Sequence, residues 1–117
     1  MTSEEFTKNL KNLVEKINNQ PKILQYIREW IGQHDGKIIG FNLPNEKYYL
    51  AFGPDEVKLY DGEPASFDII LIADTETFTG NLFGESKQIR TAVKQGRIGM
   101  WGNYHELHKL EQLLEKM

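Results

Sequence analysis

The chain has 117 residues, of which 39% are hydrophobic and 26% charged, and these are ordinary values for a globular protein. Its net charge of −3 argues against nucleic acid as a partner, because nucleic-acid-binding domains are usually basic. The sequence contains no cysteine, which excludes disulfides, thiolate nucleophiles and cysteine-ligated metals.

Two amphipathic helices are predicted at the N-terminus, because apolar residues recur there with the period of a helix face. The first stripe comprises Phe6, Leu10, Leu13, Val14 and Ile17, and the second comprises Ile23, Leu24, Ile27, Trp30 and Ile31. Thr2 and Glu5 have the spacing of a capping box for the first helix. Pro21 suits the first turn of the second helix, which we expect to end near Gly32 or Gly36.

Four strands are predicted next. Three short segments rich in aromatic and β-branched residues, each bounded by turn residues, favour an antiparallel meander. These segments are 37–43, 48–52 and 57–60. The fourth strand, 67–73, is apolar on both faces except at Asp68, which favours coverage on both sides or a central position in the sheet. Asp74 then has the character of an N-cap for a first short helix, a helical turn through Phe78, Leu82 and Phe83.

The last third of the chain predicts a helix, a strand and a final helix. The first of these helices, about 85–95, should stop at Gly96, and the strand should run over 97–102. Asn103 with Glu106 is expected to cap the final helix, whose inner face consists of leucines. The predicted fold class is therefore α+β, a five-stranded, mostly antiparallel sheet covered by helices in one domain, residues 1–117.

A pattern of landmarks within residues 66–114 resembles the sterol carrier protein-2 family. The landmarks are an apolar strand, an acidic helix start, a glycine, and an alanine and glycine before a strand that ends in Gly-Asn. In this chain they are Ile69 to Ile72, Asp74, Gly84, Ala92, Gly96-Arg97-Ile98 and Gly102-Asn103. Ala92 lies four residues before Gly96, and Gly102 lies six residues after it, as in the family's pattern.

The resemblance implies a protein without enzymatic activity that binds or transfers lipids in an apolar tunnel between helices and sheet. The ligand would be a fatty acid, a fatty acyl-CoA or a sterol-like molecule, with helix 103–117 as a movable cover. The candidate lining residues are Phe6, Leu10, Ile17, Ile27, Trp30, Phe78, Leu82, Phe83, Met100, Leu110 and Leu114. The same side chains would also form an ordinary hydrophobic core, and periodicity does not distinguish a filled core from a lined cavity.

Three cations, Lys87, Arg90 and Lys94, are expected along one side of the helix near residue 90. One interpretation is an electropositive rim that attracts a fatty-acid carboxylate, the phosphates of coenzyme A or an anionic membrane surface. A solvated helix face is the alternative, and it is the interpretation that we favour.

The residues that could carry other chemistry are few. His105 and His108 lie three residues apart, whereas the strong zinc motif places two histidines four apart around a glutamate. Asp68 and Asp74 are six residues apart around a strand and cannot be assumed to meet as an acid and a base. No cofactor, metal or catalytic residue is therefore predicted.

A second hypothesis is an interaction module. The apolar surface would then be used to form a homodimer, or the protein would use it as an accessory subunit of a lipid-modifying enzyme. A cytoplasmic location is the simplest interpretation, because no apolar run reaches the roughly eighteen residues of a membrane span and the polar N-terminus does not resemble a secretory signal.

Overall fold

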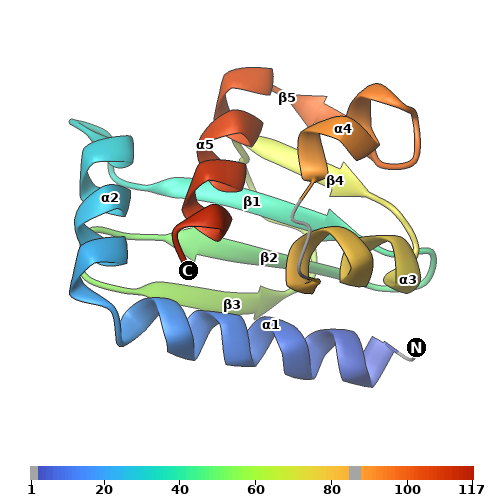
Figure 1. Ribbon diagram of the computed structural model, residues 1–117, viewed down its shortest axis with the longest axis horizontal. Coiled ribbons are helices and arrows are strands. Elements are labelled where there is room, and N and C mark those ends of the chain that lie inside the picture. Colours follow the sequence, from blue (N-terminus) through green and yellow to red (C-terminus); the bar gives the residue numbers. More distant parts are fainter. Residues whose placement is uncertain (1–2, 85–87) are drawn as a thin grey trace.

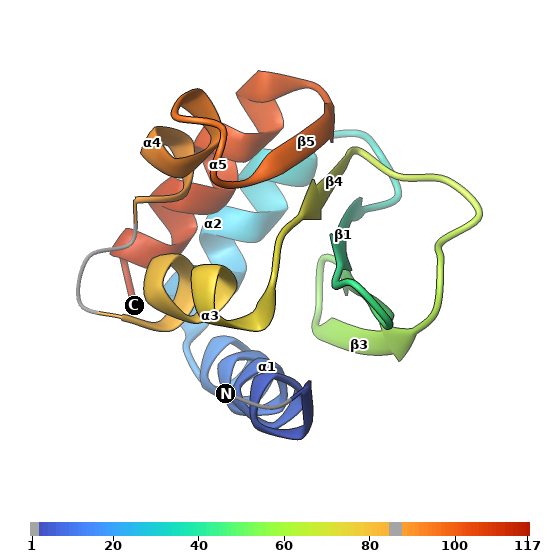
Figure 2. The ribbon, with the colours of Figure 1, turned by 90° about the vertical axis from the view of Figure 1, so that its right-hand side faces the viewer.

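The computed structural model describes residues 3–84 and 88–117, and in it five strands form one sheet with the helices gathered on one of its faces (Figures 1 and 2). The N-terminal helices are α1 (Ser3–Asn18) and α2 (Pro21–Ile31), and the strands are β1 (Lys37–Asn42), β2 (Lys47–Phe52), β3 (Val57–Asp61), β4 (Ile69–Ile72) and β5 (Gly99–Gly102). The remaining helices are α3 (Thr75–Phe78), the π-helical turn η1 (Thr79–Phe83), α4 (Ile89–Lys94) and α5 (Tyr104–Glu115).

The strands lie in the order β3-β2-β1-β4-β5. The pairs β1–β2, β2–β3 and β4–β5 are antiparallel, whereas β1 and β4 run parallel. The predicted fold class, a mostly antiparallel sheet with helices, is confirmed, and so is the meander of the first three strands. Hydrophobic side chains of the sheet and the helices form one core between them, in which Phe6, Phe41 and Leu71 are completely or almost completely buried.

The fourth strand differs from its prediction in length and in coverage. It spans Ile69–Ile72, and Phe67, which was placed in it, lies outside the strand with 43% of its surface exposed. Ile69 and Leu71 face the helices and are buried, whereas Ile72 is 38% exposed. Of the two alternatives expected for this strand, coverage of both faces was wrong, because alternate residues point to the side of the sheet away from the helices. The other alternative, a position inside the sheet, is observed, since β4 lies between β1 and β5.

The end of α4 explains why the following strand starts later than predicted. Gly96 has a φ of 75° and its N–H donates to the Val93 carbonyl at 3.1 Å, while the Arg97 N–H donates to the Ala92 carbonyl at 2.9 Å. This pair of bonds is the Schellman motif, which ends a helix with a glycine. The predicted stop at Gly96 is confirmed, and the turn delays β5 to Gly99.

Other predicted helix boundaries have mixed outcomes. Pro21 lies in the first turn of α2, as expected. The Asp74 carboxylate accepts from the Thr77 N–H at 2.7 Å, which confirms the N-cap and holds the pKa of Asp74 below its usual value. The predicted helix over 85–95 is observed from Ile89, and its residues 85–87 lie outside the described part of the chain, as does Thr2 of the proposed capping box.

We predict that Gly102→Ala destabilises the protein much more than Gly62→Ala. Both glycines have positive φ, 115° and 94°, which costs an alanine about 1–2 kcal/mol. A Cβ at position 102 would also lie 2.2 Å from the Asp68 carbonyl oxygen, whereas at position 62 it meets nothing within 4 Å. We expect losses of about 3–4 and about 1–2 kcal/mol respectively in urea unfolding. Equal losses would contradict the close approach of β5 to Asp68.

Candidate functional site

The interior between the helices and the sheet contains all the candidate lining residues. Of the eleven side chains, Phe83 and Met100 are half-buried and the others are buried. The buried ones are Phe6, Leu10, Ile17, Ile27, Trp30, Phe78, Leu82, Leu110 and Leu114. The structure thus brings the predicted set to one region of the molecule, where they pack as a core.

Aromatic rings fill the part of this interior near α1 and α3. The Phe6 ring centroid lies 5.5 Å from that of Phe78, 5.8 Å from that of Phe83 and 6.3 Å from that of Phe41. Phe41 and Phe78 are 5.6 Å apart in an edge-to-face arrangement. We call these four side chains the phenylalanine cluster. Phe41 was missed as a candidate because the sequence shows only that it belongs to a strand, not which face it joins. A ligand in this region would have to displace rings from one another.

An opening of about 290 Å³ leads from the surface toward the phenylalanine cluster. It lies between α1, η1 and the C-terminal residue, and its apolar lining consists of Leu13, Leu82, Phe83 and Met117. Its polar lining on α1 and just beyond consists of Asn9, Asn12, Lys16 and Gln20. Phe83 therefore borders both the opening and the cluster.

Sequence reasoning missed the polar side of this opening, although a signal was present. The polar residues recur at offsets of three and four, which places them along one side of the helix beside the apolar stripe. They are Asn9, Asn12, Lys16 and Gln20. The wall opposite is formed by η1, and π-helical turns are rare and frequently occur at functional sites. In this turn the buried Asn81 amide donates to the Thr77 carbonyl at 2.8 Å.

The two described members of the proposed cationic rim interact with α5. Arg90 forms an ion pair with Glu111, and this hydrogen bond raises the pKa of Arg90. The Arg90 Nη1 also lies 2.6 Å from His108 Nδ1, which must accept because a guanidinium only donates. The Lys94 ammonium lies 5.8 Å from the centre of the Tyr104 ring. Lys87 lies outside the described residues.

The Glu106 carboxylate has a different partner from the one expected. It does not complete a capping box; Asn103 alone caps α5, by accepting from the His105 N–H at 2.8 Å. Glu106 Oε2 accepts from the Trp30 indole N–H at 3.1 Å and lies 2.9 Å from the Lys37 ammonium. The side chains of Glu106 and Lys37 are each only 11% exposed. The spacing of Asn103 and Glu106 suggested a capping box. Because the Glu106 side chain is nearly buried, its carboxylate needs a positively charged partner, and it pairs with Lys37 and not with the helix end.

Further groups hold the middle of α5 against α2. The Tyr26 hydroxyl donates to the Lys109 carbonyl at 2.9 Å, and Gln112 Oε1 lies 3.1 Å from the same hydroxyl. Burial, followed by the charge of Glu115, raises the pKa of Tyr26. Movement of α5 as a whole cover would therefore break contacts with α2, α4 and β1 together.

Within residues 3–84 and 88–117, no three His, Asp or Glu side chains are grouped so that they could hold a metal ion. His105 is exposed, and His108 is the contact of Arg90 described above. None of the helices in this described part is both long enough and apolar enough to span a membrane.

We predict that Glu106→Gln lowers the free energy of unfolding by about 3 kcal/mol, because it leaves the Lys37 ammonium almost buried without a counter-charge. The double variant Lys37→Met/Glu106→Leu should lose less than Glu106→Gln alone, since it removes both charges. Lys47→Met, which breaks the exposed pair with Glu63, should lose less than about 1 kcal/mol. Urea unfolding measures all three, and a Glu106→Gln variant as stable as the parent would contradict the buried pair.

Comparison with known proteins places this geometry in a family. The profile of the SCP-2 sterol transfer family matches residues 8–115, whereas no curated protein matches the chain. A solved UbiJ-SCP2 ubiquinone synthesis protein is similar over 97% of this chain and 96% of that one, with 13% identity and a TM-score of 0.72. Sterol carrier protein domain 2 of Helicoverpa armigera is similar over 93% and 84%, with 23% identity and a TM-score of 0.64.

The palmitated SCP2L2 protein of Aedes aegypti is similar over 79% of this chain and 90% of its own, with 19% identity and a TM-score of 0.53. At these identities the likenesses show the fold, and they confirm the architecture expected from the sequence landmarks. Since the family profile covers nearly the whole sequence, the chain belongs to the SCP-2 sterol transfer family.

Proposed function

We propose that this protein binds one apolar lipid between its helices and its sheet and releases it chemically unchanged. A fatty acid, a fatty acyl-CoA or a sterol-like molecule is the class of ligand considered. The observation that carries the proposal is the opening between α1, η1 and Met117, because its apolar wall continues into the phenylalanine cluster. The solved relative from Aedes aegypti is described as palmitated, which supports a hydrocarbon chain as the ligand.

A flexible hydrocarbon chain suits this interior better than a rigid ring system. Each buried methylene contributes about 0.8 kcal/mol, so a long chain binds tightly without polar recognition. A chain can pass between rings one methylene at a time, whereas a fused-ring sterol requires the whole phenylalanine cluster to separate. Phe83 is half-buried and touches both regions, so its rotation is the movement that admits a chain.

The headgroup would remain at the surface beside α1. Lys16 is the only cation among the described residues that line the opening, and Asn9 and Asn12 stand with it. Arg90, by contrast, is already paired with Glu111. An anionic headgroup, such as a carboxylate, therefore meets an ammonium group at Lys16 and amide side chains next to it.

Leu13→Glu should weaken palmitate binding to the delipidated protein by at least about tenfold, because a carboxylate would stand in the apolar wall of the opening. Leu24→Glu is the matched control, since Leu24 is also a half-buried leucine that packs against the core but lies on α2 away from the opening. Isothermal titration calorimetry measures both, with unfolding curves to show that both variants are folded. Equal weakening would place the ligand elsewhere, and no binding by the parent would refute the lipid-carrier proposal.

Lys16→Gln should reduce affinity for palmitate by roughly three- to tenfold and leave affinity for hexadecanol unchanged, because only the carboxylate interacts with the ammonium group. Lys11→Gln is the control, as Lys11 is exposed on α1 and does not line the opening. The same titrations apply. An equal loss for the alcohol would show that Lys16 acts through packing and not through charge.

A second candidate function is that of an accessory subunit, or homodimer, that presents a lipid to a modifying enzyme. It is favoured by the match along almost the full length of both chains with a protein described as a UbiJ-SCP2 ubiquinone synthesis protein. In that case lipid binding and a protein contact would both be required, and the two should use different surfaces.

A further inference from the structure

One face of the sheet is turned away from the helices (Figure 2), and cross-strand pairing sets a row of mostly apolar residues across it. Cross-strand pairing places Tyr60, Tyr49, Gly40, Ile70 and Trp101 side by side, one from each strand. The rings at the β3 end of the row are stacked, with centroids 5.1 Å apart. At the other end Trp101 is 66% exposed. We call these five residues the outer row.

The outer row has the length of a short helix. A Cβ on Gly40 would lie 2.9 Å from Ile70 Cγ1, so the Ile70 side chain leans over the glycine and closes the gap in the row. Five strands at a spacing of about 4.8 Å make the row about 19 Å long. A helix of about 13 residues has the same length at 1.5 Å per residue.

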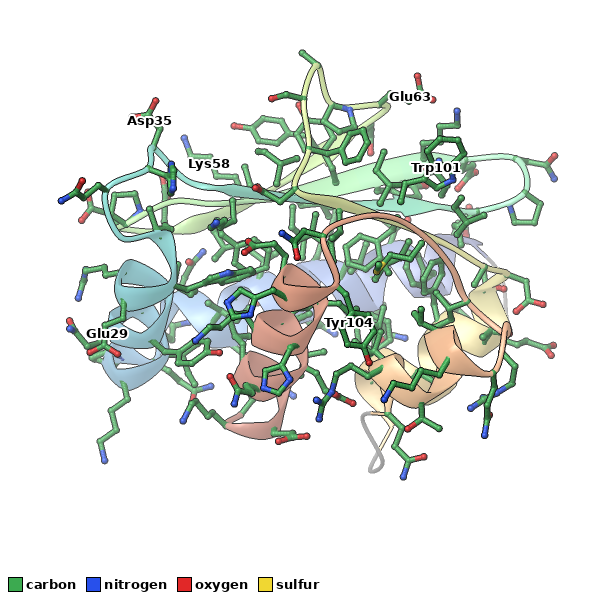
Figure 3. The ribbon with its side chains drawn as sticks, turned by 90° about the horizontal axis from the view of Figure 1, so that it is seen from above. Glu29, Asp35, Lys58, Glu63, Trp101 and Tyr104 are labelled. Carbon is green, nitrogen blue, oxygen red and sulfur yellow. The ribbon has the colours of Figure 1, made fainter. Side chains whose placement is uncertain are left out.

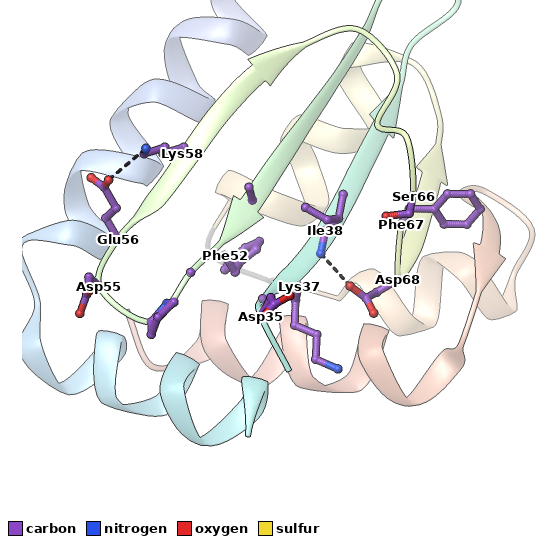
Figure 4. Close-up of a pocket in the computed structure, with 14 residues that line it drawn as sticks. Asp35, Lys37, Ile38, Phe52, Asp55, Glu56, Lys58, Ser66, Phe67 and Asp68 are labelled. Carbon is purple, nitrogen blue, oxygen red and sulfur yellow. Dashed lines mark hydrogen bonds and ion pairs between the residues drawn. The ribbon is translucent and has the colours of Figure 1, made fainter. Parts of the chain in front are cut away.

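A groove of about 600 Å³ adjoins one side of the outer row (Figure 4). Ile38 and Ala51 contribute to its lining from the same face of the sheet, and Phe67, which is 43% exposed, contributes from the segment before β4. Asp35 and Asp55 stand at the turns that border it. The groove is separated from the phenylalanine cluster by the sheet itself, so it is not part of the proposed lipid site.

The residues that line this groove carry more negative than positive charge, with Asp35, Asp55, Glu56 and Asp68 against Lys37 and Lys58. Outside the lining, the Arg28 guanidinium lies near the same turn, where it donates to the Pro54 carbonyl at 2.8 Å. Lys58 pairs with Glu56 at 3.3 Å, and Lys47, farther along the face, pairs with Glu63. Asp35 and Asp55 have no hydrogen-bond or ion-pair partner in the part of the chain that the structure describes. The Lys37 ammonium does not offset them, since it pairs with Glu106 on the helix side.

We propose that the outer row and the groove beside it bind a basic amphipathic segment of another protein. Its apolar side chains would cover the row, with Trp101 as the main anchor, because tryptophan and tyrosine dominate binding energy at protein interfaces. Its lysine or arginine side chains would face Asp35 and Asp55. The inference does not depend on lipid binding, and it assigns a surface to the accessory role.

Charge decides against the other occupants. A second copy would bring acidic side chains of the same kind to this face, and an anionic membrane would also meet them with like charge. The surface is also small: a contact about 19 Å long and one helix wide lies at the lower end of interface sizes, which corresponds to a transient complex. A single helical segment fits these limits.

The test uses three synthetic peptides of about 14 residues, the helix length that spans the row. One is a lysine–leucine amphipathic helix, one is its glutamate–leucine counterpart, and one is a lysine–serine peptide without an apolar face. Binding is followed by the fluorescence of Trp101 and, for variants, by calorimetry at low and high salt. Only the lysine–leucine peptide should bind the full chain, and high salt should lower the affinity of that complex.

Two matched pairs of variants locate the contact. Figure 3 shows Trp101 and Asp35 toward the outer face of the sheet, and Tyr104 and Glu29 on the side of the helices. Trp101→Ser should lower the affinity for the lysine–leucine peptide about tenfold. Tyr104→Ser, which removes an exposed aromatic ring from the helix side, should change that affinity less than about twofold. Asp35→Asn with Asp55→Asn should weaken it about threefold and reduce its salt dependence, whereas Glu29→Gln on α2 should not.

Several outcomes would overturn the inference. These are equal binding of the glutamate–leucine peptide, equal loss in the Tyr104→Ser variant, or a concentration-dependent mass that Trp101→Ser abolishes, which would identify a second copy as the occupant. Binding to anionic vesicles that Trp101→Ser abolishes would identify a membrane instead. Palmitate affinity is measured on the same variants and should be unchanged, so failure of this inference is distinguishable from failure of the lipid proposal.

Discussion

The carboxylate of Glu106 joins α5 to two consecutive elements from the first third of the chain, α2 and β1. It accepts from the Trp30 indole on α2 and pairs with the Lys37 ammonium at the start of β1. Charges at this depth are stable only when they are paired, so the contact holds the first turn of α5 to both elements. Glu111 and Arg90 hold the middle of the helix to α4. The opening borders Met117, just beyond the other end of α5, so a ligand that entered there as proposed would leave the buried pair intact.

Side chains along β4 alternate between the two faces of the sheet. Ile69 and Leu71 point into the core beneath the helices, while Ile70 and Ile72 point outward beside Trp101. A strand that is apolar on both faces is normally covered on both faces. The helices of the described residues, 3–84 and 88–117, cover one face of this sheet and leave the other without a helix (Figure 2). Packing of the chain's own core therefore does not account for the apolar residues on the other face. These residues are the reason for proposing a binding partner there.

Local sequence signals were sufficient to predict helix ends that a single residue type marks. Asp74 as an N-cap and Gly96 as a helix stop followed from such signals and were confirmed. The sequence also predicted which side chains would be buried together. It could not predict that Glu106 would leave the cap for Trp30, or that Arg90 would pair with α5, because both depend on how helices distant in sequence are placed. The opening was missed for the same reason, since its walls come from both ends of the chain.

The phenylalanine cluster explains how a lipid carrier remains folded without its lipid. An empty tunnel of ~400 Å³ would cost on the order of 10 kcal/mol at ~24 cal/mol per Å³, which is comparable to the stability of a whole domain. Rings in mutual contact avoid that cost, and each aromatic pair adds about 0.5–1.5 kcal/mol beyond its burial. Lipid binding is then an exchange of ring contacts for methylene contacts. In the proposed function, affinity depends on the difference between the two sets of contacts, and the return of Phe83 to Phe6 would accompany release of the chain.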